Sequence, residues 1–235
     1  MKIGIIIAVR MSSKRLPGKV LMKIKGKEII KYIYERLETT NIKKENIVFA
    51  TSDDASDDII ERFCNKNSYL CFRGSKNNVA ERLLNCAKKF RFDAFIRICG
   101  DNVFTDREII NSMIEIFKKG NYEVVTNTFE RTFPYGMSVE IINKNFYEKI
   151  FPQIIDSSDK EHVTKNIYEN FKNFNIYNYK SENKKYKDIK LSLDTKKDFE
   201  IIKKIINSFK RDHREYKIND IIELYYSIKE DKISN

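Results

Sequence analysis

The first half of the chain alternates short apolar segments with amphipathic ones, and this alternation limits the fold more than any other feature. The apolar segments resemble buried strands, and the amphipathic segments repeat apolar residues at helical spacing. Such alternation predicts an α/β fold with a mostly parallel sheet covered by helices on both faces. We expect strands at Ile3–Val9, Asn46–Thr51, Tyr69–Phe72, Asp93–Ile98 and Glu123–Asn127, and helices at Glu28–Glu38, Asp57–Asn65, Val79–Phe90 and Arg107–Lys118.

The rhythm changes between residues 128 and 187. Here "FPYGMSVEII" predicts a turn followed by a strand, and "KEHVTKNIYENF" predicts a helix. We interpret this region as an arm or insertion on a single domain that spans residues 1–235, and we expect it to form subunit contacts. The earlier pattern then returns with a strand at "IKLSL", a helix at "FEIIKKIINSF" and a final helix at Asn219–Ile228.

The net charge of +11 raises the question of nucleic-acid binding. The lysines are scattered from end to end among Ile, Asn and Asp, so the sequence shows no basic stripe with stacking aromatic residues. A surplus of positive charge also attracts small polyanionic substrates. We therefore expect a small anionic ligand and no nucleic-acid partner.

Composition and the apolar runs indicate the cellular compartment and the chemical state of the cysteines. A hydrophobic content of 41% and a charged content of 34% are typical of a globular protein. No apolar run approaches the roughly 20 residues that span a bilayer, and the opening "MKIGIIIAVR" is charged too early for a secretory signal. We expect a cytoplasmic protein with no membrane partner. The four cysteines occur singly, which favours free thiols over a zinc site.

A cationic loop, "AVRMSSKRLPGKVL", directly follows the first apolar segment. Arg10 and Arg15 can fork onto phosphate oxygens, and Lys19 offers a compact charge. Ser12 and Ser13 add hydroxyl and backbone N–H groups that suit an anion. The loop lacks both glycine-rich phosphate-binding patterns, GxGxxG and GxxxxGK[ST]. A solvated basic loop is the alternative, but its apolar residues favour a loop pinned to the sheet.

The same stretch resembles a known family. "IIIAVRMSSKRLPGKVLMKIKGKEII" is similar to the signature of the cytidylyltransferases that activate sugar acids, the CMP-Kdo and CMP-sialic acid synthetase superfamily. It most resembles the branch of spore-coat polysaccharide cytidylyltransferase-like proteins. The resemblance continues in order through "FRGSKNNVAERLLNCAKKF", "RICGDN", "PYGMSVEI", "EHVT" and "LDTKKDF".

This resemblance implies a fold and an activity. The fold is a three-layer α/β/α, nucleotide-diphospho-sugar-transferase-like (Rossmann-like) architecture. The activity is transfer of CMP from CTP to a sugar acid or related acceptor with release of pyrophosphate, in the synthesis of surface-polysaccharide or glycoconjugate precursors. The acceptor is a small anion, either a sugar acid or a phosphorylated or phosphonate compound. A homodimer is also implied.

The resemblance further implies roles for individual residues. The segment "ATSDD" lies near the cytosine, with a helix N-cap as the alternative role for its two aspartates. The implied catalytic residues are Arg10, Lys19 and Asp101, and the implied nucleotide-binding residues are Ala8, Arg10, Ser12, Arg15, Lys19, Ser52, Asp53, Arg73, Gly74 and Arg97.

Two aspartates are candidate ligands for Mg²⁺. Asp101 follows one expected strand and Asp194 follows another, so both carboxylates reach the ligand edge of the sheet. Hard oxygen donors of this kind suit magnesium beside a triphosphate. The alternatives are a helix N-cap for Asp194 and a turn for Asp101.

Other readings stay open on the sequence alone. A glycosyltransferase of similar architecture is one, although "GDN" lacks the second acid of Asp-x-Asp, and a non-catalytic basic binding protein is another. Tyr135, Ser138 and Lys190 depart from the residues commoner in the family, on the acceptor side of the expected site. Glu140 is either a surface or a substrate-side group. His162 is either a helix-surface or interface histidine or a catalytic base, and the resemblance implies that the segment Glu161–Thr164 lies near the substrate pocket or the dimer contact.

Overall fold

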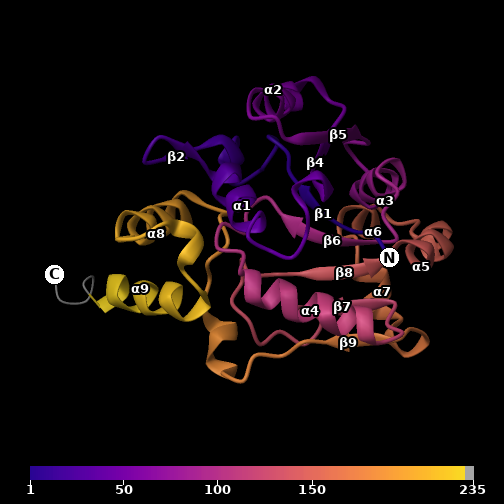
Figure 1. Cartoon of the computed structure of the whole chain (residues 1–235). Coiled ribbons are helices and arrows are strands. Elements are labelled where there is room, and N and C mark those ends of the chain that lie inside the picture. Colours follow the sequence, from indigo (N-terminus) through magenta and orange to yellow (C-terminus); the bar gives the residue numbers. More distant parts are fainter. Residues whose placement is uncertain (231–235) are drawn as a thin grey trace.

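The computed structural model describes residues 1–230, and its central feature is a seven-stranded sheet with the order β5-β4-β1-β6-β8-β7-β9 (Figure 1). Strands β1, β4, β5 and β6 are parallel to their neighbours within this group, and β7 is parallel to β9. Strand β8 runs antiparallel to β6 and β7. The expected mostly parallel sheet is confirmed. The strands are β1 Ile3–Ala8, β4 Ile47–Ser52, β5 Leu70–Gly74, β6 Ala94–Cys99, β7 Val124–Thr126, β8 Glu140–Asn143 and β9 Ile176–Asn178.

Helices connect these strands where the amphipathic pattern predicts them. A two-stranded ribbon, β2 Lys23–Ile24 and β3 Lys27–Glu28, precedes the first helix. No helix within residues 1–230 is long and apolar enough to cross a membrane. The helices are α1 Ile29–Leu37, α2 Asp58–Lys66, α3 Val79–Lys89, α4 Arg107–Lys119, α5 Lys144–Ile150, α6 Ser157–Glu161, α7 Lys165–Glu169, α8 Lys196–Asn207 and α9 Ile218–Glu230.

Two apolar layers cover the sheet, one on each face. Successive side chains of β1 point to opposite faces, so Ile5 and Ile7 join one layer and Ile6 joins the other. The first layer contains apolar residues of α1, α2, α4, α8 and α9, and the second contains those of α3, α5 and α7. All three isoleucines are fully buried, and each contributes about 1.5–3 kcal/mol relative to an exposed side chain. The expected three-layer α/β/α arrangement is confirmed.

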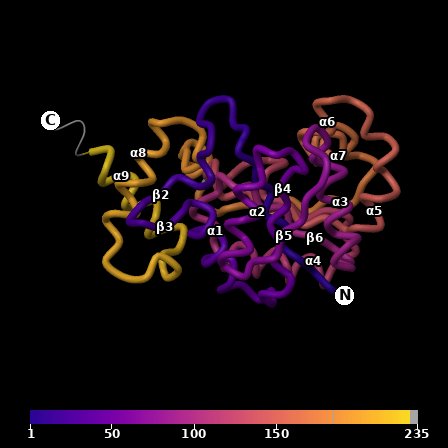
Figure 2. The backbone as a smooth tube through the Cα atoms, turned by 90° about the horizontal axis from the view of Figure 1, so that it is seen from above, coloured from indigo at the N-terminus to yellow at the C-terminus, as the bar shows by residue number. Residues whose placement is uncertain are grey.

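The region 128–187 contributes two strands, β8 and β9, to the central sheet. Between them lie α5, α6 and α7, at the end of the molecule opposite α8, α9 and the β2–β3 ribbon (Figure 2). The region expected to form an arm is therefore partly integrated into the sheet. Its role in subunit contacts stays a prediction.

Two local predictions are wrong. The segment "KEHVTKNIYENF" forms no continuous helix, because α6 ends at Glu161 and α7 begins at Lys165. The hydroxyl of Thr164 donates to Glu140 at 2.6 Å, and that of Tyr147 donates to the Val163 carbonyl at 2.9 Å, which holds the break in place. The segment "IKLSL" is no strand, and its one bridge joins Lys190 to Tyr135.

Gly136 permits the loop that contains Tyr135 to lie close to the backbone of residues 191 and 192 next to that bridge. Its φ is +96°, and a Cβ atom at this position would lie 2.5 Å from the backbone of Leu191 and Ser192. The Tyr135 amide donates to the Ile189 carbonyl at 3.0 Å, and the Leu191 amide donates to the Tyr135 carbonyl at 2.7 Å. A glycine is therefore required where the 134–138 loop meets the segment that leads into α8.

We predict that Gly136→Ala lowers the free energy of unfolding by more than about 2 kcal/mol, because it combines an unfavourable φ with a clash against backbone. Gly26→Ala is the matched control, since Gly26 has φ +77° but nothing within 4 Å of the added Cβ. The control is expected to lose only about 1–2 kcal/mol. Urea unfolding of both variants measures the difference, and equal losses would show that the close approach carries no cost.

Candidate active site

The candidate site lies where β1 and β6 end side by side. The chain leaves β1 toward β4 on one side, whereas β6 starts the other half of the sheet, so the loops beyond these two strands diverge. The Gly100 amide donates to the Ala8 carbonyl at 2.9 Å, which continues the pairing to the edge. A cavity of about 420 Å³ opens there.

The cationic loop after β1 is fixed to this edge. The Met11 amide donates to the Asp57 carboxylate at 2.7 Å, and the Gly18 amide donates to the Met11 carbonyl at 2.9 Å. Leu16 and Val20 are buried in the apolar layer below. The loop is therefore pinned to the sheet, as its apolar residues predict.

Lys19 joins three segments that are far apart in the sequence. Its Nζ donates to Asp101 Oδ2 at 2.9 Å, to the Leu193 carbonyl at 2.5 Å and to Asp194 Oδ1 at 3.3 Å. The Lys19 side chain is 12% exposed, so this contact is largely shielded from solvent. The predicted convergence of Lys19, Asp101 and Asp194 at one edge is present in the structure.

Asp194 lies among three cations. Arg15 Nη2 is 2.9 Å from Asp194 Oδ1, and Lys190 Nζ is 3.4 Å from Oδ2. Burial raises the pKa of Asp194, but the charge of Lys19, its hydrogen bond, and the charges of Arg15 and Lys190 outweigh burial and hold the pKa below its ordinary value. Asp194 is therefore ionised at neutral pH. It does not cap α8: Thr195 is the N-cap and forms a capping box with Asp198.

The two aspartates suit a divalent cation only in part. Both carboxylates contact one ammonium, so they face a common point where a cation fits. Within residues 1–230, no group of three or more His, Cys, Asp or Glu side chains is arranged to hold a metal. A magnesium ion at this point would need its remaining oxygen ligands from a bound phosphate group and water.

Arg10 and Arg97 line the same cavity together with Ala8. Arg10 is paired with Glu161 through two contacts, at 2.5 and 3.1 Å. This pair is more than a third exposed on each side, so it stabilises the fold by no more than about 1 kcal/mol and can be displaced by a ligand.

Arg82, which the sequence analysis missed, also lines this cavity. It lies on α3, is 2% exposed and donates to the Ser75 carbonyl at 2.9 Å, while its Nε has no hydrogen-bond partner among the described residues. Burial lowers the pKa of Arg82, and the nearby charge of Arg10 lowers it further. A charged residue on the apolar face of an expected helix is the sequence signal for such a position.

Five residues expected at the nucleotide do not line the cavity. Ser12 is exposed on the loop, and Asp53 is exposed after β4. Arg73 donates to the carbonyls of Ser52 and Asp54 and pairs with two acidic residues of α2. These contacts tie β4, β5 and α2 together. The role of Ser12, Ser52, Asp53, Arg73 and Gly74 in nucleotide binding stays a prediction.

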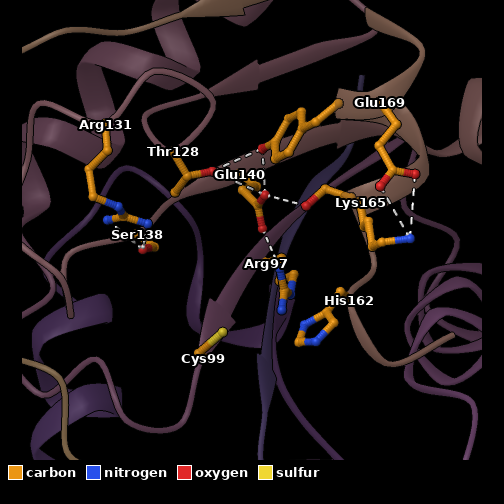
Figure 3. A pocket seen from close by; sticks show the side chains of 11 residues that line it. Arg97, Cys99, Thr128, Arg131, Ser138, Glu140, His162, Lys165 and Glu169 are labelled. Carbon is orange, nitrogen blue, oxygen red and sulfur yellow. Dashed lines mark hydrogen bonds and ion pairs between the residues drawn. The ribbon is translucent and has the colours of Figure 1, made fainter. Parts of the chain in front are cut away.

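A second cavity of about 550 Å³ adjoins the first, and the two share Arg97, Cys99 and His162 as lining residues (Figure 3). His162 thus lies in the break between α6 and α7 at the boundary of both cavities. His162 is itself exposed, and its role stays a prediction.

Glu140 lies at the base of the second cavity and is 4% exposed. It pairs with Arg97 at 2.5 Å and accepts hydrogen bonds from Thr164 and Tyr168, both at 2.6 Å. Burial raises its pKa, but Arg97 and these hydrogen bonds outweigh burial, so the pKa falls below its ordinary value. Glu140 is a buried anion that holds Arg97 in place.

Comparison with known proteins agrees with this geometry. The family model for cytidylyltransferases matches residues 4–229. A solved cytidylyltransferase from Leptospira borgpetersenii serovar Hardjo-bovis superimposes with a TM-score of 0.91 at 32% identity, covering 98% of this chain and 96% of that one.

Two curated relatives extend the comparison. The spore coat polysaccharide biosynthesis protein SpsF of Bacillus subtilis is 32% identical over 205 residues, which cover 84% of this chain and 83% of SpsF. The 3-deoxy-manno-octulosonate cytidylyltransferase of Fusobacterium nucleatum is 28% identical over 184 residues, which cover 75% of this chain and 72% of that enzyme. These matches decide against a glycosyltransferase and against a non-catalytic binding protein. The chain belongs to the cytidylyltransferase family and is a CTP-dependent nucleotidyltransferase.

Proposed function

We propose that this enzyme transfers CMP from CTP to a sugar acid, with the triphosphate in the first cavity and the acceptor in the second. The observation that carries the proposal is Lys19, whose ammonium is held between Asp101 and Asp194 beside the cationic loop. The names of the relatives support the acceptor class, because one relative is a 3-deoxy-manno-octulosonate cytidylyltransferase. The name of SpsF supports a place in surface-polysaccharide synthesis.

The reaction needs positioning and charge neutralisation more than covalent chemistry. An acceptor hydroxyl oxygen attacks the α-phosphorus of CTP and releases its proton to water, the bond from that phosphorus to the bridging oxygen breaks, and pyrophosphate leaves. Arg10, Arg15 and Lys19 would exchange their carboxylate partners for phosphate oxygens and offset the charge that grows on pyrophosphate. Arg97, at the boundary of the two cavities, would orient the reacting groups.

A magnesium ion completes the proposed site. Asp101 and Asp194 would hold it, and when bound it would polarise the α-phosphate. We further propose that the enzyme is a cytoplasmic homodimer. Contacts through residues 128–187 would build the dimer.

We predict that Lys19→Ala lowers kcat/KM for CTP by about 100-fold or more, because it removes a charge that offsets the leaving pyrophosphate. Lys23→Ala is the control, since Lys23 lies nearby in sequence and its side chain is 60% exposed. Pyrophosphate release measures both variants, with thermal melting to confirm folding. A folded Lys19→Ala enzyme within about threefold of wild type would contradict the role of Lys19.

We predict that Asp101→Asn and Asp194→Asn each raise the magnesium concentration for half-maximal activity by at least about tenfold, because each removes one anionic ligand. Asp188→Asn, at an exposed position, is the matched control. Binding of Mn²⁺ in the presence of CTP, followed by electron paramagnetic resonance, gives a readout that does not depend on turnover. Unchanged Mn²⁺ binding in both variants would place the metal elsewhere.

We predict that wild-type enzyme releases pyrophosphate from CTP in preference to ATP, GTP and UTP, and only when a sugar acid is present. The assay combines each nucleotide with Mg²⁺ and a panel of acidic and neutral sugars. Release with neutral sugars alone, or consumption of a nucleotide sugar, would overturn the proposed function.

A further inference from the structure

The second cavity contains one cation that no carboxylate neutralises. Arg97 is paired with Glu140, and Lys165 has two carboxylate partners at 2.7 and 3.3 Å. Arg131, from the loop between β7 and β8, makes no ion pair with any residue of the described chain, 1–230. The cavity therefore presents one uncompensated guanidinium (Figure 3).

The Arg131 guanidinium is held in position by uncharged groups. Its Nη1 and Nη2 both lie 3.3 Å from Ser138 Oγ, and its Cζ lies 4.3 Å from the centroid of the Tyr135 ring. A hydroxyl and an aromatic face orient a cation without cancelling its charge. Less rotamer entropy is then lost when the guanidinium binds a ligand.

The support beneath Arg131 is connected to the candidate metal site. The Ser138 carbonyl accepts a hydrogen bond from Asn102 Nδ2 at 3.0 Å, and Asn102 directly follows Asp101. Asn127 Nδ2 donates to the Met137 carbonyl at 2.9 Å, and Asn127 Oδ1 accepts from the Val139 amide at 2.8 Å. Two asparagines thus fix the loop that carries Ser138 next to the turn that carries Asp101.

We propose that Arg131 binds the anionic group of the acceptor and that Ser138 sets this specificity by remaining uncharged. The inference rests on the proposed function and names the residue that selects the acceptor. A planar guanidinium fork matches the two oxygens of a carboxylate and also those of a phosphate or phosphonate. The other two cations of the cavity already have carboxylate partners, so an incoming anion gains most at Arg131.

Two variants test this inference through different changes. Arg131→Gln removes the charge, and Ser138→Asp keeps the arginine but places a carboxylate where Ser138 Oγ now contacts both terminal nitrogens. Each variant is expected to raise KM for a sugar acid by at least about tenfold while KM for CTP changes less than about twofold. Arg62→Gln is the matched control, because Arg62 is exposed on α2 and makes no ion pair within the described residues.

Acceptor analogues identify the recognised group. Wild type is expected to prefer the free carboxylate over the carboxamide of the same sugar by at least about tenfold, and Arg131→Gln is expected to lose that preference. A phosphorylated sugar of similar size is the third acceptor in this comparison, after the carboxylate and the carboxamide. A preference for this sugar over the carboxylate, lost in Arg131→Gln, supports Arg131 with phosphate as the recognised group. Equal KM increases for carboxylate and carboxamide in Arg131→Gln would show a merely structural role and overturn the inference.

Direct binding separates this inference from the proposed function. Calorimetry measures the binding of 3-deoxy-manno-octulosonate, its carboxamide and the phosphorylated sugar to wild type and to Arg131→Gln, in the absence of CTP. Charge-dependent binding that is lost in Arg131→Gln supports the inference even if no pyrophosphate is released, in which case the proposed function alone fails. Turnover or binding that is indifferent to acceptor charge, or no binding of any anion, overturns the inference.

Discussion

Strand β1 lies inside the sheet, hydrogen-bonded to β4 on one side and to β6 on the other, and an apolar layer covers each of its faces. Such a strand leaves no place for a charged side chain along its length, because an unpaired buried charge is far too costly. Charge can appear only where the strand ends, and Arg10 is the first charged residue beyond it. The parallel pairing of β1 with β6 then brings Asp101 to the same edge. The site is a consequence of this burial.

The candidate site keeps most of its cations beside carboxylates. Lys19 lies between Asp101 and Asp194, and Arg10 lies against Glu161. These pairs fix the cations in place, which limits the entropy lost on binding. In the proposed function, a triphosphate binds Lys19 and Arg15 and so removes these cations from the carboxylates of Asp101 and Asp194, which are then left facing each other. A divalent cation would restore the balance, so the proposed substrate and metal would favour each other's binding.

The sequence predicts the fold well where periodicity decides and poorly where tertiary contacts decide. Strands such as β1 and helices such as α3 follow directly from the spacing of apolar residues. The segment "IKLSL" alternates like a strand, but periodicity does not reveal whether a partner strand is available, and Tyr135 supplies only one bridge. The break at His162 depends on Glu140, which lies in another element and accepts the Thr164 hydroxyl. The helix propensity of the residues around His162 does not reveal that contact.

The same limit applies to the site. Asp101 was predictable at this edge because it follows β6, and strand ends of one sheet converge. Asp194 follows no strand, and its segment is held at the edge by the Leu193 amide, which donates to the Asp101 carbonyl at 3.1 Å. Arg73, Arg82 and Arg131 look alike in the sequence. Arg73 is fully paired with two acidic residues of α2 and two backbone carbonyls, whereas Arg82 is buried beside the first cavity. Arg131 lines the second cavity, where it contacts a serine. What an arginine can do depends on whether a carboxylate reaches it, and that is a property of the packed chain. Because its neighbour Ser138 carries no charge, Arg131 keeps a guanidinium that no carboxylate of the described residues reaches, and its proposed role depends on this feature.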